Sequence, residues 1–205
     1  MKKNDEEDDE NMNIKVILLG ETGVGKTNLI NAVKGLNFIE NTESTLNIKC
    51  LQKTMNIYKK NYSINLWDTA GQEKFRALNK LYYKESKIVL LVYDISNINS
   101  FKALEEYWLD EIRAFQGNEP ILGLVGNKSD LSDKKEVNDI IAQKFAEDNN
   151  MKFKLCSCKD DPKSFNLFLR SLVKEYIIKM KNDYESNKFE LDKDDGGAYG
   201  SCITI

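Results

Sequence analysis

The sequence predicts an α/β fold with a mostly parallel sheet, one antiparallel edge strand and helices on both faces. Short apolar runs alternate along the chain with longer segments of helical spacing. Each apolar run is nearly continuous, as in strands that are buried on both faces. Strands that alternate with helices form βα units and a parallel sheet. The exception is residues 46–67, where two extended segments meet with no helix between them.

The predicted strands are the apolar runs bounded by loops. They cover residues 14–20, 64–67, 88–94 and 121–126. A further extended segment precedes residues 64–67 and turns around Lys59, Lys60 and Asn61. This hairpin supplies the antiparallel edge strand.

The predicted helices lie between these strands. They cover residues 25–35, 100–115 and 137–148. A last helix begins at Pro162, with Asp161 as its cap, and its apolar residues recur every three or four positions as far as Ile177.

Charge divides the chain into three parts. The 205 residues have a formal net charge of -3 and are 41% hydrophobic, which suits one domain with a sizeable core. Residues 1–13 and residues 182–205 each hold two lysines and six acidic residues, whereas residues 14–181 are mildly basic. We expect an acidic flexible N-terminus (1–13), one folded domain (14–181) and a flexible C-terminal tail (182–205).

Composition excludes several kinds of protein. There are 0 histidines, so no Ser-His-Asp triad and no His-ligated metal site can form. The 4 cysteines fit neither a zinc site nor a disulfide framework. No basic stripe with interleaved aromatics indicates nucleic-acid binding, and no run of 18 apolar residues spans a bilayer. The acidic N-terminus is unlike a secretory signal, so we expect a cytosolic chain.

A glycine-rich loop joins the first predicted strand to the first predicted helix. Residues 20–27 fit the pattern G-x-x-x-x-G-K-[ST], in the strand and helix context that this pattern needs. Glycines let backbone N–H groups approach phosphate oxygens, and the helix N-terminus adds partial positive charge. Lys26 is expected to reach the terminal phosphates and the Thr27 hydroxyl to coordinate Mg²⁺. The alternative is an ordinary turn into a helix. We expect a nucleoside triphosphate to bind at Glu21, Thr22, Gly23, Val24, Gly25, Lys26, Thr27 and Asn28.

A second motif, Asp-Thr-Ala-Gly-Gln-Glu at residues 68–73, follows a predicted strand. Asp68 would lie at the edge of the sheet where ligands bind, and there it can hold Mg²⁺ directly or through a water. Gly71 can present its N–H to the terminal phosphate, and Gln72 can orient a water molecule for attack. Alone the segment could equally be a polar turn, but its place after a phosphate loop favours the metal and water roles.

A third motif, Asn-Lys-Ser-Asp at residues 127–130, indicates the base. The Asp130 carboxylate only accepts hydrogen bonds, which suits the ring N–H and amine of guanine and would leave it unpaired against adenine. Lys128 can lie along the base plane beside Asn127. The alternative is a solvated turn. A weaker candidate for the guanine carbonyl is the backbone of Ser157, Cys158 and Lys159.

In combination these motifs resemble those of the small GTPases of the Ras superfamily, most of all the Rab branch. The resemblance covers residues 14–180 and implies a P-loop G domain with a six-stranded sheet. It implies GTP, GDP and Mg²⁺ binding, and slow GTP hydrolysis with Gln72 and Lys26 as catalytic residues. It also implies a molecular switch in vesicle trafficking.

Further residues match the family position by position. Thr45, 18 residues after Thr27, matches a Mg²⁺-binding threonine, and Phe38 matches the aromatic that packs on guanine. Rab-like stretches include Trp67 before the second motif and residues 74–78, 82–84 and 92–96.

Two cysteines depart from the family pattern. Cys50 replaces an aromatic that forms the effector-binding patch with the counterparts of Trp67 and Tyr82. A thiol covers much less area than a ring, so we expect atypical effectors. Cys158 replaces an alanine, which is a mild change because the backbone N–H makes the contact.

The C-terminal Cys202-Ile203-Thr204-Ile205 resembles a prenylation box. One prenyl chain without a polybasic stretch anchors weakly, so we expect reversible association with the cytosolic face of an intracellular membrane. The alternative is an unmodified cysteine. The resemblance implies an exchange factor, a GTPase-activating protein and effectors as partners of a monomer.

Two rival functions remain open from the sequence. The altered residues 46–50 suit a module that binds GTP or GDP and hydrolyses almost none. A P-loop kinase or ATPase is the other rival, and the intact motif at residues 127–130 argues against it.

Overall fold

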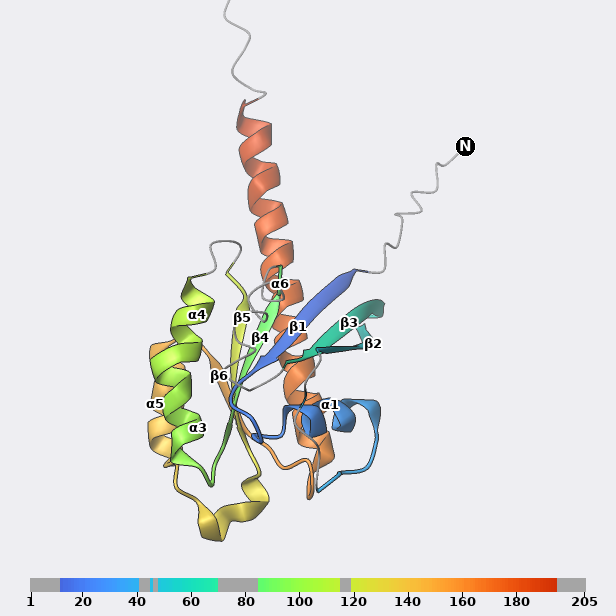
Figure 1. Cartoon of the computed structure of the whole chain (residues 1–205). Coiled ribbons are helices and arrows are strands. Elements are labelled where there is room, and N and C mark those ends of the chain that lie inside the picture. Colours follow the sequence, from blue (N-terminus) through green and yellow to red (C-terminus); the bar gives the residue numbers. More distant parts are fainter. Residues whose placement is uncertain (1–11, 41–44, 46–47, 70–84, 115–118, 195–205) are drawn as a thin grey trace, which may run out of the picture.

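Six strands form one sheet in the order β2-β3-β1-β4-β5-β6. The computed structural model describes residues 12–40, 45, 48–69, 85–114 and 119–194, and the side chains only as far as residue 186 (Figure 1). All neighbouring strands are parallel except β2 and β3, which confirms the predicted fold with its antiparallel edge strand. The strands are β1 Asn13–Leu19, β2 Lys49–Ile57, β3 Lys60–Asp68, β4 Ile88–Asp94, β5 Ile121–Asn127 and β6 Lys152–Leu155.

A two-residue turn joins β2 to β3. Tyr58 and Lys59 have φ angles of 51° and 65°, the left-handed conformation that matches the twist of a hairpin. The turn begins one residue earlier than the sequence predicts, and Lys60 and Asn61 belong to β3.

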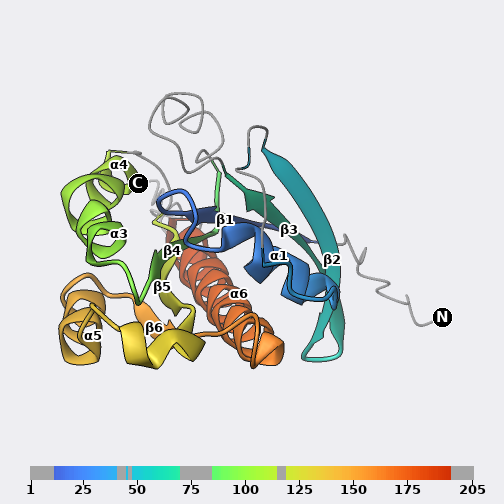
Figure 2. The same cartoon turned by 60° about the horizontal axis from the view of Figure 1, so that its bottom comes forward.

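Helices cover both faces of the sheet, as predicted (Figures 1 and 2). One face carries α1 (Lys26–Lys34) and α6 (Pro162–Asp194). The other carries α3 (Ile98–Ala103), a π-helical turn (Leu104–Trp108), α4 (Leu109–Arg113) and α5 (Asp139–Asp148). A short 3₁₀ segment, Ser129–Lys134, follows β5.

Strand β1 shows why the central strands are apolar throughout. Ile14, Val16 and Leu18 pack under α1 and α6, whereas Ile17 and Leu19 pack against the opposite layer. All five side chains are fully buried. Alternation therefore divides the strand between two cores, and neither face tolerates polar residues.

Helix α6 begins as predicted and ends later than expected. Asp161 caps it by accepting a hydrogen bond from the Ser164 N–H at 3.2 Å, and Pro162 is its first residue. Among the side chains that the structure describes, which reach residue 186, the last fully buried one is Ile177. The helix nevertheless continues to Asp194, through residues expected to form a flexible tail. No glycine interrupts the sequence between Pro162 and Gly196, and the lysines and glutamates of this stretch favour helix.

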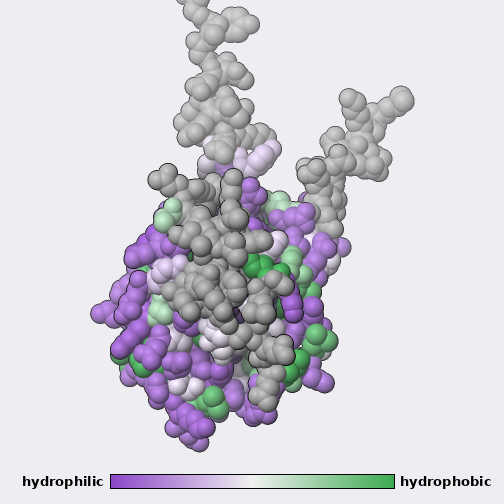
Figure 3. All heavy atoms as spheres, viewed as in Figure 1, coloured by the Kyte–Doolittle hydropathy of each residue, from purple (hydrophilic) through white to green (hydrophobic). Residues whose placement is uncertain are grey.

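The surface visible in Figure 3 is largely hydrophilic, with separate hydrophobic spots. Within the described part of the chain, no helix combines the length and apolarity needed to cross a membrane.

Candidate functional site

The glycine-rich loop lies where β1 ends and α1 begins, and two of its glycines are required by close contacts. A Cβ on Gly20 would lie 2.1 Å from the Val92 carbonyl oxygen, and one on Gly25 would lie 2.3 Å from the Asn127 side-chain nitrogen. Gly23 has a φ of 82°, but its missing Cβ would meet nothing within 4 Å. The loop therefore follows a path that only glycine allows, with the N–H groups of the first turn of α1 directed towards it.

The Lys26 side chain crosses this loop. Its ammonium donates to the carbonyl oxygens of Gly20 at 2.8 Å and Glu21 at 2.9 Å, and the residue is only 6% exposed. Burial lowers the pKa of Lys26 to about 8, and the carboxylates of Asp68 and Glu21 oppose this shift. A buried cation whose contacts within the described part of the chain are backbone carbonyls is well placed to bind an anion.

Three oxygen-bearing side chains converge beside the loop. The Thr27 hydroxyl donates to Asp68 Oδ2 at 2.8 Å and lies 3.1 Å from the Thr45 hydroxyl oxygen, and Thr45 lies 3.4 Å from the same carboxylate oxygen. Thr27 belongs to α1, Thr45 follows it by 18 residues, and Asp68 ends β3. The structure thus brings together the three residues predicted to hold a metal ion.

The donor set suits Mg²⁺. Asp68 is 3% exposed, and its Oδ1 atom is buried without a hydrogen-bond partner. Burial raises the pKa of Asp68, whereas the Thr27 hydrogen bond and Lys26 lower it. Hard oxygen ligands with one carboxylate are typical of Mg²⁺, which keeps waters in its remaining positions. Among the described residues no group of three or more His, Cys, Asp or Glu side chains is placed to hold a metal ion.

Asn127 connects the predicted base segment to the phosphate loop. Its amide donates to the Val24 carbonyl at 2.8 Å, and its Oδ1 accepts a weak hydrogen bond from the Cys158 thiol at 3.7 Å. Three segments that are distant in sequence therefore meet at one buried side chain, which is 2% exposed.

Asp130 and Lys128 are held by partners that the sequence did not reveal. Asp130 accepts a hydrogen bond from the Ser157 hydroxyl at 2.6 Å, so the two predicted base-binding segments are adjacent. Lys128 has a φ of 63° and pairs with Asp94 at 2.6 Å. These contacts fix the backbone of both segments at the carboxyl end of the sheet.

Cys158 and Lys159 differ in exposure. Cys158 is 7% exposed, and burial raises the pKa of its thiol to about 12, so the thiol is protonated and unreactive. Lys159 is exposed to solvent.

The segment after α1 carries the predicted aromatic. Phe38 is 40% exposed, and the next residue, Ile39, exchanges two hydrogen bonds with the Asn28 side chain, at 2.9 and 3.3 Å. Asn28, predicted to contact nucleotide, thus also anchors this segment to α1.

A contact from the opposite core reaches the loop. The Trp108 indole N–H donates to Glu21 Oε1 at 3.0 Å across 87 residues of sequence. No local pattern signals a partnership over that separation.

The predicted effector patch is described only in part. Cys50 and Trp67 face each other across β2 and β3, and the Lys15 ammonium lies 5.0 Å from the centre of the Trp67 ring. Cys50 is exposed. Tyr82, and likewise Gly71, Gln72 and Cys202, lie outside the described residues.

Comparison with known proteins adds independent findings. The sequence model of the Ras family matches residues 15–177, a range that contains all the site segments above. The Ras-related protein Rab-30 of Homo sapiens is 37% identical over 155 residues, which make up 76% of this chain and 76% of that protein.

Proposed function

The chain belongs to the Ras family of small GTPases, whose members bind guanine nucleotides and hydrolyse GTP, and from this premise we propose that it is a Rab-type molecular switch in vesicle trafficking. The observation that supports the proposal most is the meeting of Lys26, Thr45, Asp68 and residues 127–130 at one edge of the sheet.

In this proposal each segment contacts one part of GTP. The loop N–H groups and the Lys26 ammonium bind the β- and γ-phosphates, in place of the loop carbonyls that Lys26 contacts here. Asp130 accepts from the ring N–H and amine of guanine, Phe38 packs against the base, and the backbone at Cys158 donates to the guanine carbonyl.

Thr27, Thr45 and Asp68 would hold Mg²⁺. When bound, the ion neutralises charge on the phosphate oxygens. The unpartnered Asp68 Oδ1 and the two hydroxyls support this assignment.

Hydrolysis is proposed to need a partner. Gln72 orients the attacking water, but a glutamine is a weak base and an added positive charge is needed at the transition state. Among the described residues the two arginines, Arg113 and Arg170, hydrogen-bond elsewhere, to the Asn149 side chain and to the Asn56 carbonyl. A GTPase-activating protein would supply the charge, and an exchange factor would release GDP.

The switch itself would act through Thr45 and Gly71. Both contact the γ-phosphate when GTP is bound, and hydrolysis releases both segments. Effectors would bind beside Cys50 and distinguish the GTP-bound from the GDP-bound arrangement of these segments. The small exposed thiol of Cys50 favours partners unlike those of most Rab proteins.

A single-turnover assay with full-length protein tests the proposed function. Gln72→Leu should slow stimulated GTP hydrolysis at least tenfold and keep GTP affinity within about twofold, because only the positioning of water is lost. Gln143→Leu makes the same change on α5, where the exposed Gln143 donates a hydrogen bond to Glu147, and should behave as wild type. Equal hydrolysis rates for Gln72→Leu and wild type would contradict the role of Gln72, and negligible phosphate release by wild type with cell extract would favour a non-hydrolysing binding module.

A further inference from the structure

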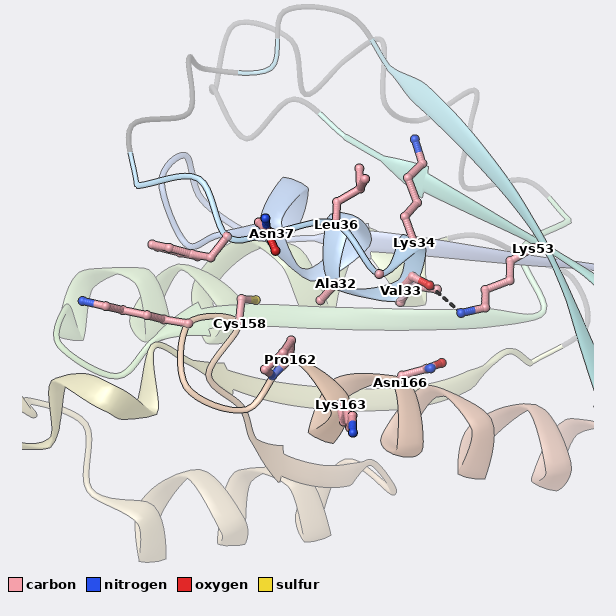
Figure 4. A pocket seen from close by; sticks show the side chains of 13 residues that line it. Ala32, Val33, Lys34, Leu36, Asn37, Lys53, Cys158, Pro162, Lys163 and Asn166 are labelled. Atoms are coloured by element: carbon pink, nitrogen blue, oxygen red, sulfur yellow. Dashed lines mark hydrogen bonds between the residues drawn. The ribbon is translucent and has the colours of Figure 1, made fainter.

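A groove of about 410 Å³ lies between α1 and the start of α6. Figure 4 shows it bounded by the C-terminal end of α1, the segment that follows, and the first turns of α6. One end reaches Phe38 and Cys158, beside the nucleotide site, and the other reaches Lys53 of β2.

The groove is basic. Four of its lining residues are lysines, namely Lys34, Lys53, Lys159 and Lys163, and no residue that lines it is acidic. Asp161, in the same loop as Lys159, is occupied in capping α6. The Lys53 ammonium caps the Val33 carbonyl at the end of α1 and still contributes its charge. The nucleotide site uses none of Lys34, Lys53 and Lys163, and Figure 4 shows the Lys34 and Lys163 side chains directed outward on either side of the groove, so their charge is left for an anion that lies along its rim.

The chain carries such an anion in its own sequence. Residues 5–10, Asp-Glu-Glu-Asp-Asp-Glu, form an unbroken acidic run just before β1. In the sheet register Lys53 pairs with Ile64, and Ile64 pairs with Ile14, so Lys53 lies about 10 Å from Ile14, two strand spacings away. Met12 packs against the core on the same face as α1 and α6.

The acidic run is long enough to follow the groove. At about 3.5 Å per residue, Glu10 can lie roughly 14 Å from Ile14 and Asp5 roughly 30 Å from it. Helix α1, which forms one wall, is about 13 Å long for its 9 residues. Residues 5–10 can therefore span from Lys53 to the lysines at the other end.

We propose that the acidic segment 5–10 docks within its own chain in the basic groove between α1 and α6. Individual surface ion pairs are weak and screened by salt. Tethering compensates for these weak ion pairs, because a segment attached at Met12 is present at millimolar effective concentration. A separate acidic peptide would lack this advantage.

Docking has a consequence that rests on the proposed function. Phe38, Cys158 and Lys159 line both the groove and the predicted guanine pocket. A segment held there restrains the residues that must separate for the base to leave, so it would slow GDP release.

Carbodiimide cross-linking of the full-length chain tests the docking without using nucleotide activity. The reagent joins carboxylates to amines in contact, and mass spectrometry identifies the pairs. We expect cross-links from residues 5–10 to Lys34, Lys53 or Lys163 at yields at least fivefold above those to Lys102 and Lys144, which are exposed on α3 and α5 at the opposite face. Mixing isotopically light and heavy chains should show that the cross-links form within one chain.

A charge-reversal pair supplies the second measurement. Lys34→Glu with Lys163→Glu should lower cross-linking to Lys53 and Lys159 at least fivefold, whereas Lys102→Glu with Lys144→Glu should leave it within twofold. Similar yields at all lysines, cross-links only between chains, or no response to the groove reversals would each overturn the proposal. Loss of hydrolysis with intact cross-linking would instead count against the proposed function alone.

Discussion

At the scale of single residues, Lys26 gives the site a pH dependence. Burial lowers its pKa to about 8, so in the free protein its charge is lost as the pH rises through that value. Bound phosphates favour the ammonium and raise its pKa, so binding takes up a proton above about pH 8. GTP affinity should therefore be constant at lower pH and fall, by up to about tenfold per pH unit, as the pH rises above about 8.

Calorimetry between pH 7 and 9, in buffers of different ionisation enthalpy, measures both the affinity and the proton uptake. Lys26→Arg is the control, because arginine keeps its charge throughout this range, and its weaker binding should show no such fall. An equally steep fall in that variant would assign the pH dependence to another group.

Single residues also mark the limit of sequence reasoning. The motifs predicted that Thr27, Asp68, Asn127 and Asp130 belong to one site, because patterns of this kind follow strand ends. They did not predict Trp108 donating to Glu21, since that contact depends on how two layers pack.

At the scale of elements, the phosphate loop offers a matched pair of identical substitutions. Gly20→Ala places a Cβ 2.1 Å from a backbone oxygen of β4, so either the loop or the strand must shift. In Gly23→Ala the added Cβ has no atom within 4 Å, so the only cost is the backbone strain of alanine at a φ of 82°, about 1–2 kcal/mol. We expect Gly20→Ala to lower the free energy of unfolding by at least about 2 kcal/mol more than Gly23→Ala.

Urea unfolding of the nucleotide-free protein, followed by circular dichroism, measures this difference. Similar losses for the two variants would mean that the contact between Gly20 and Val92 relaxes without cost.

Most elements could be predicted because the buried strands and the amphipathic helices have strong periodicity. Strand β6 was given no residues, because its alternation of lysine and apolar side chains lasts for only four residues and is too short to stand out as a strand. The end of α6 was misplaced for a different reason. Loss of apolar periodicity after Met180 shows where packing stops, but helical backbone can continue in solvent where the residues favour it.

At the scale of the whole molecule, membrane association is expected to depend on a prenyl group attached to Cys202. Cys202→Ser should lower the membrane-bound fraction in cells at least severalfold, because the acidic C-terminal region offers no attraction to anionic lipids once the prenyl chain is lost. Cys50→Ser, the same change at an exposed cysteine of β2, should leave the fraction unchanged. Cell fractionation measures both, and equal fractions for wild type and Cys202→Ser would argue against lipid attachment.

The length of α6 sets a distance for any such anchor. The helix runs 17 residues beyond Ile177, the last fully buried of its described side chains, and this length is about 25 Å at 1.5 Å per residue. Figure 1 shows this part extending away from the sheet as a single rod. A lipid attached past its end would hold the nucleotide-binding domain away from the bilayer by more than the width of two packed helices. This distance leaves room for a partner protein to bind between the domain and the membrane.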